Sequence, residues 1–157
     1  MTAPAKAEFA GLGREILASA ARHSDRIAVT AYGEKLTYDA FASHAACLAQ
    51  TLTDLGAGEV GTTVAILTDR SCQAYVAVAA VLFAGAAYVP LNPRFPAARN
   101  RRILASSRAR ALIVDARNAV VVPELLTGIA NPPAIVAAGC VPPRARARLS
   151  RRAATVI

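Results

Sequence analysis

The segment from residue 38 to residue 55 carries apolar side chains at helical spacing. They recur at steps of four, three, four and three, which places them on one face of an α-helix: Phe41, Ala45, Leu48, Leu52 and Leu55. Thr37 precedes this pattern, and its hydroxyl can accept a hydrogen bond from an unpaired amide of the first turn. Gly56 follows it, and glycine adopts the left-handed backbone of a helix end without a Cβ clash. We therefore predict a helix over this segment.

Two shorter patterns precede this helix. Ile16, Leu17 and Ala20 are spaced as on one side of a helix, and they predict a short amphipathic helix over residues 13–23. The apolar run RIAVTA, the turn sequence YGEK and the run LTY then predict a β-hairpin over residues 26–38.

The longest apolar run, Ala74 to Leu91, has eighteen residues without a charge. Its length lies at the lower edge of a membrane-spanning helix. However, much of the run is alanine, Gly85 divides it, and Pro90 near its end suits a strand edge better than a helix. We therefore predict a buried helix over residues 71–84, a stop at Gly85 and a short strand over residues 87–91, in preference to a membrane span.

Further strands and a helix flank this run. TTVAIL, residues 62–67, is apolar on both faces and predicts a strand in the middle of a sheet. NPRFP, residues 92–96, predicts a loop, and Pro96 suits the first turn of a helix that ends near Ser106 or Ser107. RALIVDA, residues 110–116, predicts a strand ended by Asp115. This alternation predicts an α/β fold with a mostly parallel sheet and crossover helices.

The formal net charge of +8 is typical of proteins that bind nucleic acid or anionic membranes. However, residues 139–157 hold five arginines and no acid, so residues 1–138 carry a formal charge of only +3. The basic segment predicts either a solvated tail without function or an arm that binds nucleic acid or anionic lipid without sequence preference.

Metal and thiol chemistry have little support in the sequence. Cys47, Cys72 and Cys140 are far apart and odd in number, which predicts free thiols in a reducing compartment. His44 and Cys47 lie three positions apart on the predicted helix, but no third or fourth metal ligand is near; we interpret them as a rim histidine and a core thiol. The first 26 residues lack the continuous apolar region of a signal peptide, so we expect a cytoplasmic protein.

Three motifs together resemble the beginning of the adenylate-forming superfamily, in particular the adenylation domains of nonribosomal peptide synthetases. LTY, residues 36–38, stands at the exit of the predicted hairpin, and DRS, residues 69–71, follows the next strand. AGAAYVPLNPRFPAAR, residues 84–99, is similar to the family pattern AG-x-AYVPLDP-x-YP-x-ER. The resemblance covers approximately residues 22–116.

This resemblance implies scaffold roles for its motif residues, and we assign no catalytic role to Tyr88, Asn92 or Arg99. Asn92 stands where peptide synthetases usually have Asp and where the acyl-CoA synthetase branch often has Asn, which weakens the choice between the two branches. The implied organisation is a helical segment over residues 1–24, a partial adenylation subdomain over residues 25–116 and an irregular basic tail over residues 117–157.

Enzymes of this superfamily join a carboxylate to ATP, release pyrophosphate and form an acyl-adenylate, with ATP and Mg²⁺ as the groups implied for the full-length family. This chemistry requires a Ser/Thr/Gly-rich loop ending in Lys, carboxylates for Mg²⁺ and ribose, and a lysine at the reacting carboxylate. The sequence contains no such loop, Lys6 and Lys35 are its only lysines, and no acid follows Glu124. We therefore assign no catalytic, cofactor-binding or metal-binding residue and no cofactor to this chain alone.

The resulting expectation is a truncated N-terminal fragment of an amino-acid-adenylating ligase that is not catalytic alone. One alternative is a protein-binding module or half of a split synthetase, whose partner is the remainder of the enzyme. Another is a binder of nucleic acid or membrane surfaces through the arginines, without a membrane span. The last forty residues consist largely of Ala, Arg, Pro, Val and Leu, which suggests the hypothesis that they arise from a frameshift after codon 116 or from a degraded gene.

Overall fold

The computed structural model describes residues 11–139, which begin with a helix and a β-hairpin. Helix α1 (Leu12–Arg22) is followed by strands β1 (Ile27–Ala31) and β2 (Glu34–Thr37) and by helix α2 (Tyr38–Asp54). The two strands pair antiparallel in a sheet of their own. Because an isolated two-stranded hairpin is marginally stable in water, its contacts with α2 and with the following helix α3 (Cys72–Phe83) are needed to hold it.

The predicted start of α2 and the predicted hairpin turn are confirmed. The Thr37 hydroxyl accepts a hydrogen bond from the Ala40 amide at 3.2 Å, so it caps the first turn of the helix. The hairpin turns at Tyr32 and Gly33, whose φ angles are 50° and 82°. Two positive φ angles give the turn a twist that matches the right-handed twist of the paired strands.

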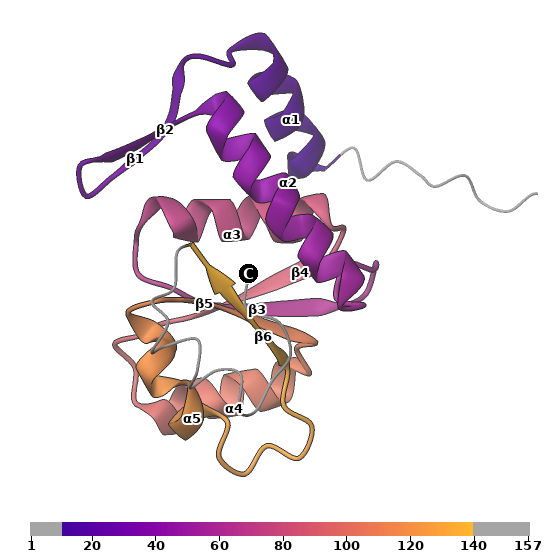
Figure 1. Ribbon diagram of the computed structural model, residues 1–157. Helices are drawn as coiled ribbons and strands as arrows, with labels where there is room; N and C mark the ends of the chain where they lie inside the picture. Colours follow the sequence, from indigo (N-terminus) through magenta and orange to yellow (C-terminus); the bar gives the residue numbers. More distant parts are fainter. Residues whose placement is uncertain (1–10, 140–157) are drawn as a thin grey trace, which may run out of the picture.

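A parallel sheet of four strands forms the centre of the molecule (Figure 1). Its strands are β3 (Thr63–Leu67), β4 (Ala87–Leu91), β5 (Ala111–Asp115) and β6 (Ala134–Ala138), in the spatial order β4-β3-β5-β6. All three neighbouring pairs are parallel and in continuous register. The predicted α/β class, and the prediction that residues 62–67 form an interior strand, are both confirmed.

Helices cover both faces of this sheet (Figure 1). Helices α2 and α3 lie on one face, with α1 packed against them. On the other face lie α4 (Ala97–Ser107), the 3₁₀-helix η1 (Asn118–Val121) and α5 (Val122–Leu125). The strands contribute side chains to both helical layers, because successive side chains point to opposite faces of a sheet.

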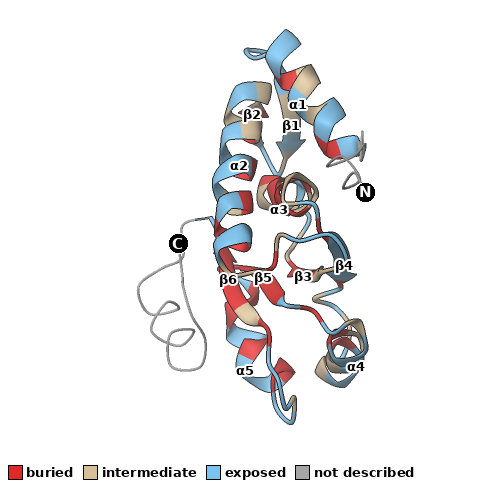
Figure 2. Ribbon diagram, turned by 90° about the vertical axis from the view of Figure 1, so that its right-hand side faces the viewer, coloured by how far each residue is buried: buried red, intermediate tan, exposed pale blue. Residues whose placement is uncertain are grey.

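The two layers have separate cores that meet only through the sheet. Val64, Ile66 and Ile113 belong to the core under α2 and α3, whereas Leu67 and Leu112 belong to the core under α4 and α5. Strands β3, β5 and β6 are therefore buried on both faces, as Figure 2 shows. Such strands are typical of parallel sheets that helices enclose.

The long apolar run is divided as the sequence predicts. Helix α3 ends at Phe83, Gly85 has a φ of +83°, and β4 covers the five residues predicted for it. At 1.5 Å per residue, a helix of this length spans only about 18 Å, against about 30 Å of hydrocarbon in a bilayer. Within residues 11–139, no helix is both long and apolar enough to cross a membrane.

The expected irregular tail from residue 117 onward is wrong for residues 118–138. These residues form η1, α5 and β6, and β6 pairs with β5 over its whole length. The prolines that suggested an irregular segment flank the elements instead: Pro123 lies in the first turn of α5, where its missing N–H is not needed, and Pro132 and Pro133 precede β6. The arginines of residues 144–152 lie outside the described residues.

Candidate functional site

The carboxyl ends of the parallel strands are the candidate location of a functional site. The chain passes from β3 to β4 on one side and then returns to place β5 on the other side of β3, so the order of the strands reverses between β3 and β5. In open α/β sheets, ligands bind outside the carboxyl ends of the strands at such a reversal. A hollow of about 310 Å³ lies there, lined by the loops after β3, β5 and β6 and by the tip of the hairpin.

The side chain of Asp115 joins the loops that follow strands β3 and β5. Its Oδ2 accepts a hydrogen bond from the backbone N–H of Asp69, and its Oδ1 accepts one each from the backbone N–H and the side-chain amide of Asn118, all at 2.8 Å. Both residues of this buried pair, Asp115 and Asn118, are only 8% exposed. Because three donors already occupy the carboxylate, we interpret it as a group that fixes the two loops, not as a general base or a metal ligand.

The remaining charges at this edge are exposed. Asp69 and Arg117 form an ion pair at 4.0 Å, with side chains that are 41% and 85% exposed. An ion pair this exposed contributes at most about 1 kcal/mol. Ser71 precedes α3 but makes no capping hydrogen bond through its side chain. The described groups at this edge therefore do not fit ATP and Mg²⁺, which need a lysine-bearing phosphate loop and carboxylates with free lone pairs.

Cys72 lies at the start of α3, next to this edge, and is fully buried. Its thiol donates a hydrogen bond to the backbone carbonyl of Glu34 at 3.6 Å. Burial first, and then the negative charge of Glu34, raises the pKa of the Cys72 thiol above its ordinary value. Because only the thiolate is a strong nucleophile, the burial and the raised pKa both disfavour nucleophilic chemistry at Cys72.

The other residues considered from the sequence are not brought together. His44 and Cys47 both lie exposed on α2, so the prediction of a core thiol at Cys47 is wrong. Lys35 is exposed on β2, whereas Lys6 and Cys140 lie outside the described residues. Within residues 11–139, no group of three or more His, Cys, Asp or Glu side chains is placed to hold a metal ion.

A second hollow of about 610 Å³ lies between α3, β4 and the loop that follows β4. Tyr88 and Asn92 line it, together with Tyr75 and Phe95. The Arg99 guanidinium lies 3.9 Å from the centre of the Phe95 ring, which is a cation–π contact. These motif residues of the sequence thus shape a loop and an apolar wall.

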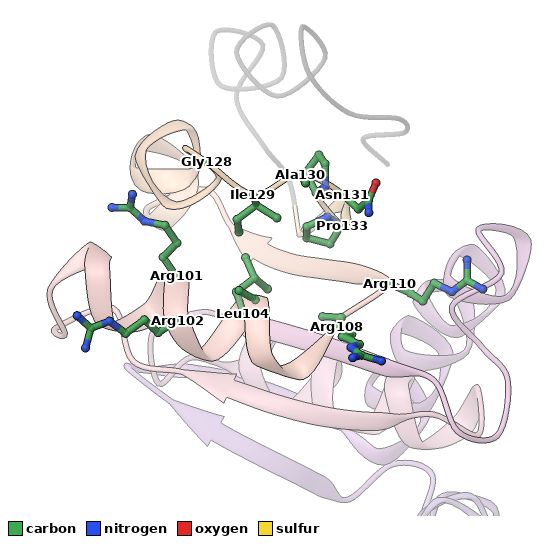
Figure 3. A pocket seen from close by; sticks show the side chains of 13 residues that line it. Arg101, Arg102, Leu104, Arg108, Arg110, Gly128, Ile129, Ala130, Asn131 and Pro133 are labelled. Atoms are coloured by element: carbon green, nitrogen blue, oxygen red, sulfur yellow. The ribbon is translucent and has the colours of Figure 1, made fainter.

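A third hollow, of about 760 Å³, lies between α4 and the loop that leads into β6 (Figure 3). Its wall includes Leu104, Ile129 and Pro133 and four arginines: Arg101, Arg102, Arg108 and Arg110. Figure 3 shows that the arginine side chains point in different directions, away from the hollow. Because the guanidinium groups do not converge on one point, the hollow is not a cradle for a phosphate or a carboxylate.

The residues of the three hollows do not identify the family of this chain, but comparison with known proteins does. A family model described as AMP-binding enzyme matches residues 16–149. The chain belongs to the AMP-binding enzyme family. The match continues beyond residue 116, where the sequence resemblance ended, and includes α5 and β6.

Two synthases of Bacillus species are similar to about three fifths of this chain. Surfactin synthase subunit 1 of Bacillus subtilis (strain 168) is 40% identical over 96 residues, which are 61% of this chain and 3% of that protein. Bacitracin synthase 3 of Bacillus licheniformis is 42% identical over 90 residues, which are 57% of this chain and 1% of that protein.

Two solved structures share the fold. The crystal structure of IdnL7 superposes with a TM-score of 0.79 at 31% identity and covers 94% of this chain and 28% of that chain. The nonribosomal peptide synthetase FmoA3 (S1046A), in the form with α-methyl-L-serine-AMP bound, gives a TM-score of 0.72 at 31% identity and covers 81% of this chain and 14% of that chain. The chain thus corresponds to the N-terminal part of an adenylation domain and spans only a small share of its relatives' length.

The site residue that sequence reasoning missed is Asp115 together with its partner Asn118. The signal for it was present, because an acidic residue directly after a buried strand, followed three positions later by Asn, is typical of a side chain that orders a loop. What the sequence did not show is the contact with Asp69, which is 46 positions away.

Proposed function

We propose that residues 11–139 are the N-terminal scaffold of an amino-acid-adenylating domain, and that adenylation requires groups outside these residues. The observation that carries the proposal is the superposition on IdnL7, in which nearly this whole chain corresponds to 28% of the other. The bound α-methyl-L-serine-AMP of FmoA3 supports an amino acid as the activated carboxylate.

The chemistry of the described residues supports the proposal that adenylation requires groups outside residues 11–139. Transfer of an adenylyl group to a carboxylate brings two anions together, so cationic groups must neutralise the phosphates and the attacking carboxylate. At the carboxyl edge, the one buried carboxylate that lines the hollow, Asp115, is saturated by three donors, and the neighbouring Arg117 is 85% exposed. These residues orient loops but do not build a nucleotide site.

Amino-acid-dependent exchange of pyrophosphate into ATP tests this proposal. The purified chain, shown by circular dichroism to be folded, is assayed with the twenty amino acids beside a complete adenylation domain as the positive control. We expect no exchange above the enzyme-free background and no binding of ATP with Mg²⁺ by calorimetry. Measurable exchange, or firm binding of ATP, would show that the described scaffold is sufficient and the proposal wrong.

The hypothesis of a lost reading frame now concerns the codons after 149, not those after 116. Strand β6 lies in register with β5, and the family match runs to residue 149, which supports residues 117–149 as an in-frame part of the domain. We propose that the downstream DNA, read in all three frames, encodes a Ser/Thr/Gly-rich run ending in Lys. Its absence from all three frames would contradict this hypothesis.

A further inference from the structure

Charge is divided unequally along the described chain. Residues 11–91 hold five cations and seven acids, a formal charge of −2, whereas residues 92–139 hold seven arginines and two acids, a formal charge of +5. Six of these arginines lie within residues 92–110, which contain α4 and no acid. Within residues 11–139 the one ion pair joins Asp69 and Arg117, so none of the six has a carboxylate within 4.0 Å. Their charges are therefore free to meet a partner.

Four of the six arginines border the third hollow, of about 760 Å³, which we call the α4 hollow (Figure 3). Its lining includes Arg110, directly before β5, and Pro133, directly before β6, so it lies at the amino ends of these strands. The loops joined by Asp115 lie at the opposite, carboxyl ends. A partner in the α4 hollow would therefore leave the carboxyl edge open.

The α4 hollow has an apolar centre and a cationic border. Leu104 of α4 and Ile129 of the loop before β6 lie at its centre, and the arginine side chains project outward around them (Figure 3). Among the described residues that line it, none is acidic. Protein interfaces commonly have an apolar centre and a polar rim, and they are enriched in arginine. Guanidinium groups that are spread around a centre suit several separate negative charges better than one.

Arg101 has a donor that the described chain does not use. Its Nη1 donates a hydrogen bond of 3.3 Å to the Thr127 carbonyl, whereas its Nε–H is buried and has no acceptor within residues 11–139. A buried donor without an acceptor costs free energy. A carboxylate can accept two parallel hydrogen bonds from one guanidinium, so an acidic partner would satisfy Arg101 better than Thr127 does.

Nucleic acid is a second class of polyanion that such a charge attracts, but the α4 hollow fits it less well. Proteins that hold single strands stack the bases on aromatic side chains, and none of the described residues that line the hollow is aromatic. Proteins that read duplex DNA insert a protruding helix or β-ribbon into a groove, whereas this surface is concave. The shape and the apolar centre therefore favour a peptide chain.

We propose that the α4 hollow is a docking site for an acidic peptide segment of a partner protein. Apolar side chains of the segment enter between Leu104 and Ile129, and its Asp or Glu residues on either side pair with the arginines of the border. The inference goes beyond the proposed function and does not depend on it, because the α4 hollow and the carboxyl edge lie at opposite ends of the strands.

Selection from a displayed library of random dodecapeptides on the folded full chain tests the chemistry of the partner. We expect enrichment of sequences in which at least two Asp or Glu residues flank apolar side chains. Enrichment of uncharged or basic sequences, or no enrichment at all, would overturn the proposal. Enriched sequences that match a segment of IdnL7 outside the superposed region would make the rest of the domain the occupant, and would overturn it as well.

Two matched double variants of the full chain test the place of binding. Arg102→Glu with Arg110→Glu reverses two exposed arginines on different sides of the α4 hollow, and Arg14→Glu with Arg22→Glu reverses two exposed arginines of α1 (Figure 3). Both variants change the net charge equally, and circular dichroism checks that each is folded. Fluorescence anisotropy measures the affinity for the most enriched peptide.

We expect the first variant to lose about tenfold or more in affinity and the control to lose less than about threefold. Affinity of the wild type should fall between low and physiological salt. The same peptide with Asn and Gln in place of Asp and Glu needs no protein variant, and it should lose about tenfold or more. Equal losses in the two protein variants would indicate attraction by net charge alone and would overturn the proposal.

Competitors and the oligomeric state test the other occupants. A single-stranded thymidine oligonucleotide and vesicles of phosphatidylcholine with phosphatidylserine are added at a charge concentration equal to that of the peptide, and neither is expected to displace it. Displacement would overturn the proposal in favour of nucleic acid or a membrane surface. Sedimentation velocity of the chain alone should show the same species for the wild type and for Arg102→Glu with Arg110→Glu; a dimer that these substitutions dissociate would make a second copy the occupant.

Discussion

Asp115 and Asn118 show how one buried polar pair joins loops that are distant in sequence. The carboxylate is the acceptor for donors from the loop after β3 and from the start of η1. Buried hydrogen-bonding groups cost free energy when their partner is removed, and charge-assisted hydrogen bonds are the stronger ones. The pair therefore stabilises the carboxyl edge without taking part in chemistry.

We predict that Asp115→Ala lowers the free energy of unfolding by about 2 to 3 kcal/mol, because it leaves the Asn118 amide and the Asp69 N–H without an acceptor. Urea unfolding followed by circular dichroism measures the change. Asp69→Ala is the control: it removes only the exposed ion pair with Arg117 and keeps the backbone donor, so we expect a change below about 0.5 kcal/mol. Equal losses in the two variants would contradict this account.

At the scale of elements, the junction between α3 and β4 decides how the long apolar run is used. Gly85 has a φ of +83°, which allows the chain to leave the helix and enter the sheet within three residues. A Cβ at this position would meet no atom closer than 4.0 Å. The requirement for glycine is therefore one of backbone conformation and not of space.

Gly85→Ala is expected to lower the free energy of unfolding by about 1 to 2 kcal/mol, the cost of a left-handed backbone for a residue with a Cβ. Gly85→Asn should cost less, because asparagine tolerates this conformation better than alanine. Thermal or urea unfolding of the three proteins gives the ranking. If alanine and asparagine were equivalent, backbone strain at this residue would not be the reason for its glycine.

At the scale of the whole molecule, two helical layers share one sheet. Adjacent residues of β5 alternate between the layers, with Ile113 under α2 and α3 and Val114 under α4 and α5. Both side chains are 0% exposed. The layers are therefore coupled through every strand, and we expect them to unfold together.

We predict losses of stability of about 0.5 to 1.5 kcal/mol for Ile113→Val and about 1.5 to 3 kcal/mol for Val114→Ala, because each removes buried methyl groups. Hydrogen exchange measured by NMR should show protection falling together in α2 and α4 for either variant, since one cooperative transition involves both. Loss of protection in α4 alone after Val114→Ala would show that the layers unfold independently.

Most elements up to residue 116 could be predicted because their signals are local. Helix α2 has its cap and its periodic face within one segment, and the prolines and Gly85 divide the next run without reference to the rest of the chain. Cys47 was misplaced because its neighbour Leu48 lies on the apolar face, and one residue turns a helix by about 100°. The hollows and the contact between Asp115 and Asp69 were beyond prediction, because they join loops from different strands.

The sequence by itself determined the helices, the hairpin, three of the four parallel strands and the likeness to adenylating enzymes, since periodicity, capping and motifs act over a few neighbouring residues. Only the tertiary structure decided that residues 118–138 form η1, α5 and β6, because their apolar side chains and prolines carry no clear period. Their order comes from burial against β5 and α4, which are distant in the chain. The tertiary structure likewise decided that arginines of α4 border an apolar hollow, because the pairing of β6 with β5 brings the loop before β6 to α4.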